Sequence, residues 1–76
     1  MRSGLFDLVL ANITAPLLVR RAPELAAACR PGGHVVVAGL LRYEVAEVRA
    51  AFEPFAEAIH VRTEGEWGAL VVRKPA

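Results

Sequence analysis

The chain has 76 residues, enough for one small domain, and 55% of them are hydrophobic. A small domain has much surface for its volume, so this apolar share predicts that the chain dimerises or belongs to a larger core. Nine basic and eight acidic residues are scattered along it. Because no basic run or basic–aromatic interleaving occurs, the composition argues against direct nucleic-acid binding.

The sequence also argues against a membrane or secreted protein. The longest apolar run, Val35 to Leu41, is too short to cross a bilayer. The first four residues lack an adjoining apolar region and a cleavage pattern, so they are not a signal peptide. A single Cys29 cannot form an internal disulfide and is expected to be a buried, inert thiol in a reducing compartment. These features predict a cytoplasmic protein.

The first predicted element is a strand from Leu5 to Ile13 that is apolar on both faces, typical of an internal parallel strand. Asn12 stands near its end, and Ala15-Pro16 follows. Proline is favoured at the first position of a helix, so a helix is expected to begin there. Ligands of open α/β sheets bind just outside the carboxyl ends of the strands, which places Asn12 for a ligand. The alternative is an Asn that ends the strand and caps the turn before Pro16.

The second predicted element is a helix with one apolar stripe, formed by Leu18, Ala22, Leu25 and Cys29. Pro23 interrupts this pattern, so it either kinks the helix or starts a second one. Arg30-Pro31-Gly32-Gly33 is expected to end the helix, with the cation in its last turn.

The remaining elements are predicted to be a strand, a helix and two more strands: His34–Leu40, Tyr43–Glu53, Glu57–Thr63 and Trp67–Arg73. The helix has Val45, Val48 and Phe52 on one face, and the strand before the hairpin alternates as if one face were buried. Gly39 allows close approach of another backbone or a ligand. The short turn at 64–66 makes the last two strands an antiparallel hairpin.

The first two strands should be parallel, joined by a right-handed crossover. The last strand is expected between His34–Leu40 and Glu57–Thr63. Two helices cannot cover four strands on both sides, so each face of this sheet is expected to be half covered.

Several segments resemble one family, the ribosomal protein L11 methyltransferases (PrmA), within the class I S-adenosylmethionine-dependent methyltransferases. They are Phe6–Ile13, Ala22–Ala26, Arg30–Gly33, Val36–Leu41, Glu64–Trp67 and Leu70–Val72. The resemblance covers Leu5 to Arg73. It implies an α/β fold: a partial Rossmann-like methyltransferase sheet of the order β-α-β-α-β-β, with the last strand antiparallel and the N-terminal half missing.

The resemblance also implies methyl transfer from S-adenosylmethionine to amino groups of a ribosomal protein. Asn12 would be the catalytic residue that orients the amine, and Ala11, Asn12 and Ile13 would line the methionine end of the cofactor. No Gly-rich turn of the type G-x-G follows any strand here. Residues 1–76 are therefore expected to be the C-terminal part of a single methyltransferase domain, inactive and with weak or no cofactor binding on its own.

Other candidate residues favour structural roles. His34, expected in a turn, and His60 have no ligand at metal spacing, so no metal site is predicted. Glu64 and Glu66 are expected to be solvent-exposed charges that flank a turn. Trp67 is expected to pack against a helix. Arg20 and Arg21 are expected to lie on a solvent-exposed face of the first helix. Ser3 and Thr14 lack an adjacent base.

A second interpretation of the sequence is a non-catalytic α/β interaction module. Such a module would pair through an exposed edge of its sheet. The expected partners are the missing N-terminal half or, by self-association through the first strand, a second copy.

Overall fold

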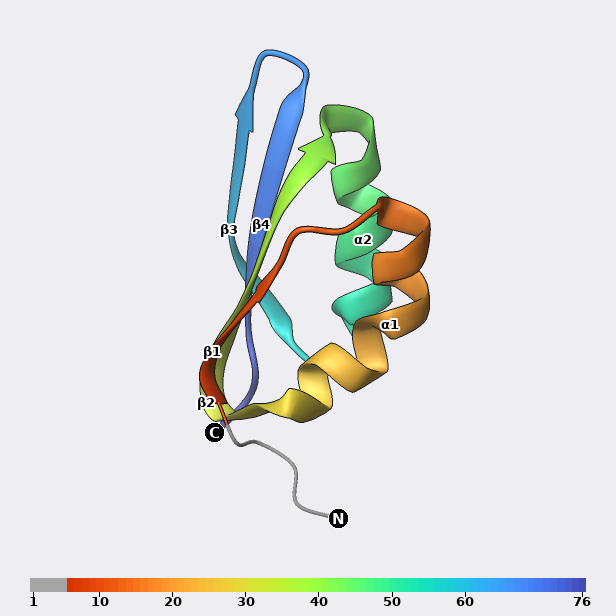
Figure 1. Cartoon of the computed structure of the whole chain (residues 1–76). Helices are drawn as coiled ribbons and strands as arrows, with labels where there is room; N and C mark the ends of the chain where they lie inside the picture. The colour runs from red at the N-terminus through yellow and green to blue at the C-terminus, as the bar shows by residue number, and fades with distance from the viewer. Residues whose placement is uncertain (1–5) are drawn as a thin grey trace.

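The computed structural model describes residues 6–76 as a four-stranded sheet with two helices (Figure 1). The elements are β1 (Phe6–Ala11), α1 (Ala15–Ala28), β2 (Cys29–Leu41), the 3-10 helix η1 (Arg42–Glu44), α2 (Val45–Phe52), β3 (Glu57–Glu64) and β4 (Trp67–Arg73). The predicted order of strands and helices is confirmed. Leu5, the expected first residue of β1, lies outside the described residues. No helix in the described part is long and apolar enough to span a membrane.

The sheet has the strand order β1-β2-β4-β3, so the predicted central position of the last strand is confirmed. β1 and β2 are parallel, whereas β4 is antiparallel to both of its neighbours. Gly65 and Glu66 connect β3 to β4, and Gly65 has a φ of +59°. A two-residue hairpin loop favours glycine there because its first residue often needs a positive φ.

Both helices lie on the same face of the sheet (Figure 1), with α1 packed on β1 and β2 and α2 packed on β3 and β4. The expectation that each face would be half covered is wrong. Both crossovers move across the sheet in the same direction, and right-handed crossovers then place their helices on the same side. The core between helices and sheet includes Leu18, Ala22, Val35, Val37, Leu40, Val48, Phe52, Leu70 and Val72, each at most 1% exposed.

The opposite face of the sheet carries apolar side chains that no helix covers. Register partners share a face, so Leu10, Val36, Val71 and His60 form one row across all four strands. Leu8 and Leu10 are 52% and 72% exposed. Among the described elements, this uncovered face therefore has no packing partner.

The junction between α1 and β2 differs from the expectation. Cys29 begins β2 rather than ending the helix, although it is fully buried as predicted. Arg30 consequently lies in the strand and not in a helical turn, and His34 pairs with Leu8 and Arg73 instead of sitting in a turn. The reason is the C-terminal tail: the Gly32 N–H donates to the Lys74 carbonyl at 2.9 Å, which extends the ladder past the glycines.

Two further details refine the predicted elements. α1 continues through Pro23 as one helix, so Pro23 does not start a second helix. The ribbon of α1 bends toward its C-terminal end in Figure 1, as expected for a kink at proline.

β3 does not have the predicted buried face: only Ala58 is partly buried, while Ile59 and Val61 are 48% and 42% exposed. The reason is that β3 is the outer strand and α2 is too short to cover its length.

Candidate functional site

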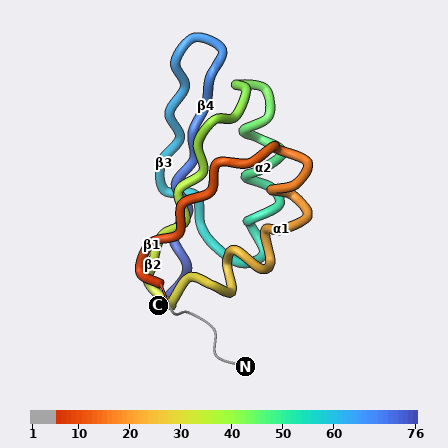
Figure 2. The backbone as a smooth tube through the Cα atoms, in the orientation of Figure 1, coloured from red at the N-terminus to blue at the C-terminus, as the bar shows by residue number. Residues whose placement is uncertain are grey.

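The carboxyl ends of β1 and β2 and the turn of the β3–β4 hairpin lie at one end of the sheet (Figure 2). Ala11 is level with Val37 of β2, which is level with Leu70 of β4. β4 begins three residues before Leu70, so the hairpin extends beyond the end of β1. This end is the ligand-binding end of open α/β sheets.

Asn12 follows β1 directly and is exposed. Within residues 6–76 its side chain makes no hydrogen bond, and the residue that caps α1 is Thr14. Within the described part of the chain, no hydrogen bond therefore supports the alternative in which Asn12 caps the turn before Pro16. The Oδ1 atom of Asn12 lies against Gly39 of β2. An exposed carboxamide beside a glycine is available to both a donor and an acceptor of a ligand.

The two neighbours of Asn12 face in different directions. Ala11 is 7% exposed and belongs to the core under α1, so only its backbone can face a ligand. Ile13 is 36% exposed. The structure thus brings one apolar side chain and one carboxamide to the surface at the end of β1.

Hydrogen bonds fix the end of β2 to the hairpin. The Arg42 N–H donates to the Glu66 carbonyl at 2.7 Å, and its guanidinium Nη2 donates to Thr63 Oγ1 at 3.0 Å. The Leu41 N–H donates to Glu44 Oε1 at 2.8 Å, which secures the start of η1. Tyr43 of η1 is 78% exposed and lines a depression of about 460 Å³.

Trp67 is 59% exposed, so the expectation that it packs against a helix is wrong. Its neighbour Gly68 faces the helices instead, with Val45 Cγ2 only 2.5 Å from the point where a Cβ would stand. Trp67 therefore lies on the uncovered face, in a depression of about 190 Å³ that Gly39 also lines. The alternation of Gly68, Leu70 and Val72 on the buried side is the sequence signal that could have revealed this.

The remaining candidates stay scattered. His34 and His60 lie on different strands, and within residues 6–76 no three metal-ligating side chains come together. Glu64 ends β3 and Glu66 lies in the turn, both exposed. Arg21 pairs with Glu24 at 2.9 Å on the exposed face of α1.

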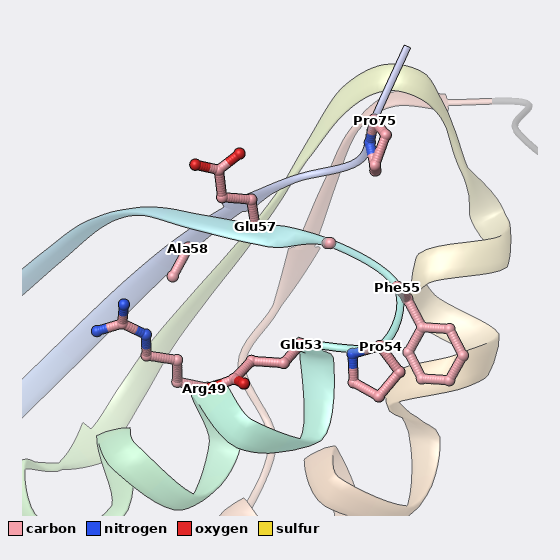
Figure 3. Close-up of a pocket in the computed structure, with 8 residues that line it drawn as sticks. Arg49, Glu53, Pro54, Phe55, Glu57, Ala58 and Pro75 are labelled. Atoms are coloured by element: carbon pink, nitrogen blue, oxygen red, sulfur yellow. The ribbon is translucent and has the colours of Figure 1, made fainter.

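A further depression lies at the other end of the sheet, between α2 and the start of β3 (Figure 3). Its volume is about 520 Å³. Arg49 and Ala58 point into it from opposite sides, whereas Glu57 points away on the far side of β3 (Figure 3). It contains no side chain that the sequence suggested for catalysis, and it is distant from Asn12 in the strand register.

Among the described residues, Cys29 is the one whose pKa departs clearly from its ordinary value. Burial raises the pKa of its thiol, and this effect outweighs the nearby Lys74 ammonium, which lowers the pKa. A thiol with a raised pKa is a poor nucleophile at neutral pH. Its position at the start of β2, at the end opposite Asn12, supports a structural role.

The comparison with known families decides the assignment. The family described as ribosomal protein L11 methyltransferase (PrmA) matches residues 1–75. The chain belongs to this family. It is 46% identical over 71 residues to a ribosomal protein L11 methyltransferase of Chloroflexus aurantiacus, and 46% identical over 71 residues to that of Geobacter sulfurreducens.

Solved structures agree with the family assignment. The crystal structure of a ribosomal protein L11 methylase from Lactobacillus delbrueckii subsp. bulgaricus superposes with a TM-score of 0.83 at 26% identity, over 96% of this chain and 38% of that chain. The partial Rossmann-like methyltransferase fold expected from the sequence is confirmed. The matches to the Chloroflexus aurantiacus and Geobacter sulfurreducens relatives each include 92% of this chain, but this chain spans only 22% and 24% of the length of those two proteins.

Proposed function

We propose that residues 1–76 are the C-terminal part of a single methyltransferase domain that transfers a methyl group from S-adenosylmethionine to amino groups of ribosomal protein L11. The observation that carries this proposal is the exposed Asn12 carboxamide, at the ligand-binding end of the sheet, in a chain of the L11 methyltransferase family. The chain covers 22% of the Chloroflexus aurantiacus relative, so the rest of the domain is expected to hold most of the cofactor.

In the proposed reaction, the lone pair of a neutral amine attacks the methyl carbon of the sulfonium. The carbon–sulfur bond breaks, its electron pair stays on sulfur as a thioether, and the methylated nitrogen later loses a proton to solvent. Asn12 Oδ1 would accept a hydrogen bond from the amine N–H and so turn the lone pair toward the methyl group. Ile13 and the backbone of Ala11 would border the methionine end of the cofactor. Orientation of this kind is a large source of rate enhancement.

The two outer strands support a chain that continues into a larger sheet. β3 carries Glu57, Arg62 and Glu64 among its eight residues, the charged pattern of a true edge strand. β1 carries one charged residue, Asp7, among six. An edge with so little charge is suited to pairing with a further strand, as expected if β1 is internal in the complete domain.

The exposed side chains of β1 also favour a second candidate function, a non-catalytic module that pairs through this edge. Phe6, Leu8 and Leu10 are all more than half exposed. The two functions differ in their partner: the methyltransferase requires the rest of its own domain, and the module requires another protein or a second copy.

A grafted enzyme tests the proposal. It is the Chloroflexus aurantiacus relative with its matching segment replaced by this chain, assayed for methyl transfer from S-adenosylmethionine to ribosomal protein L11. We expect activity, and we expect Asn12→Ala to lower kcat on the order of 10²-fold. Thr14→Ala is the matched control, because Thr14 is exposed in the same loop and its side chain makes no capping bond. A well-folded but inactive grafted enzyme would refute the proposed function.

A further inference from the structure

Gly39 interrupts the ladder of β2 next to the proposed site. The register between β2 and β4 shifts between Val37 and Leu40, so Ala38 and Gly39 form a bulge. Gly39 has a φ of +77°, which side chains other than hydrogen rarely tolerate. A bulge next to the end of a strand can redirect the surface at that point.

The space that Gly39 leaves open is filled by Asn12. A Cβ at Gly39 would collide with Asn12 Oδ1 and would stand 3.4 Å from Asn12 Cγ. The carboxamide therefore rests on the Cα of Gly39, across from β1 to β2. Within the described residues, Asn12 has no hydrogen bond to hold its side chain, and the contact with Gly39 limits where the amide can lie.

From this contact we infer that Gly39 is a positioning residue for the Asn12 carboxamide in methyl transfer. The inference rests on the proposed function, because it needs Asn12 to act on the amine. Any side chain at Gly39 displaces the amide from its place at the end of β1. Misplacement by about 1 Å can cost on the order of 10²-fold in rate.

The test uses kcat and KM of the grafted enzyme. Gly39→Ala should lower kcat on the order of 10²-fold, while the KM for S-adenosylmethionine changes by less than about twofold, as expected when an interaction made only in the transition state is lost. The matched control is Gly32→Ala. Gly32 has a similar φ of +82°, but nothing lies within 4 Å of its missing Cβ. Gly32→Ala carries the same backbone strain without the collision, so its kcat should stay unchanged.

A double-mutant cycle separates positioning from simple strain. In an Asn12→Ala background no amide remains to be displaced, so adding Gly39→Ala should change kcat by less than about twofold. If Gly39→Ala lowers kcat equally in both backgrounds, or if Gly32→Ala lowers it as much, the positioning role is overturned while the proposed function stands. If Asn12→Ala leaves kcat unchanged, the proposed role of Asn12 fails and the inference fails with it.

A measurement on the unsubstituted grafted enzyme covers the case in which Gly39→Ala does not fold. Nuclear Overhauser contacts between the Asn12 side-chain amide protons and the Gly39 Hα protons report the resting place of the amide directly. We expect these contacts with and without bound S-adenosylhomocysteine. Their absence in both states would overturn the inference.

Discussion

Leu10 of β1 and Val36 of β2 are register partners, and both face the side of the sheet that neither helix covers. Leu10 is 72% exposed although it belongs to an apolar strand. Parallel strands of α/β proteins are normally covered on both faces. This corner of the molecule, an open edge beside an uncovered apolar face, is therefore expected to control association of the isolated chain.

We predict that the isolated chain dimerises, aggregates or unfolds readily, and that Leu10→Lys shifts it toward a monomer. A lysine on an open strand opposes edge pairing and apolar contact. Sedimentation at several protein concentrations measures the effect. Leu17→Lys is the control, because Leu17 is also a leucine with an exposed side chain (37%) but lies on α1 and not on the open strand. A stable unsubstituted monomer at high concentration, with a cooperative melt above about 65 °C, would contradict this prediction.

We predict no detectable binding of S-adenosylmethionine to the isolated chain by calorimetric titration. The chain offers one strand end with Asn12 and Ile13 but no Gly-rich turn after a strand. Backbone N–H groups of such turns are a common means of close approach to a nucleotide. Micromolar affinity, about −8 kcal/mol, would show that the cofactor site has been misplaced.

A prediction on packing concerns Gly68, which faces α2. Gly68→Ala should lower the free energy of unfolding of the grafted enzyme by about 1–3 kcal/mol, because the new methyl group meets Val45 Cγ2. Val45→Ala should remove part of this loss, since it clears the space. Denaturant titration of the two single variants and the double variant measures the coupling. Strictly additive losses would show that the two residues do not share this contact.

Much of the fold could be predicted from the sequence. The apolar runs of β1 and β2, the stripe of Val45, Val48 and Phe52, and the Gly65 turn predict the elements and the hairpin, because periodicity and turn chemistry are local properties. The full strand order is what the resemblance to the methyltransferase family implies. The limits of β2 could not be predicted in this way. Its first residues are held by the C-terminal tail, through the bond from the Gly32 N–H to the Lys74 carbonyl, and such long-range pairing has no local pattern.

The candidate site was harder to predict than the fold. Asn12 could be singled out from its place after a strand, and Gly39 as a point of close approach. Their mutual contact depends on the parallel register of β1 and β2 and on the bulge at Gly39, which no single segment encodes. The prediction for Trp67 is wrong because a large aromatic side chain is usually buried, whereas here both helices lie on the other face of the sheet.

Cys29 gives a prediction on pH and reactivity. Burial raises the pKa of its thiol, so the folded thiol ionises at a higher pH than the unfolded thiol, which ionises above about pH 8.5. Its contribution to the free energy of unfolding is therefore constant below that pH and falls as the pH rises above it. Denaturant titrations of the grafted enzyme from pH 7 to pH 10 should show this fall, and Cys29→Ala should reduce it. Rapid alkylation of the folded protein at pH 8 would argue against a buried thiol.

The most direct test of the central claim is reconstitution from two separate chains. The 76-residue chain is co-expressed with the remainder of the Chloroflexus aurantiacus relative, lacking its matching segment. Methyl transfer from S-adenosylmethionine to ribosomal protein L11 is then measured on the purified complex. We predict that the two chains copurify and are active together, that neither is active alone, and that Asn12→Ala abolishes most of the activity. A stable complex of the two chains without methyl transfer would contradict the account.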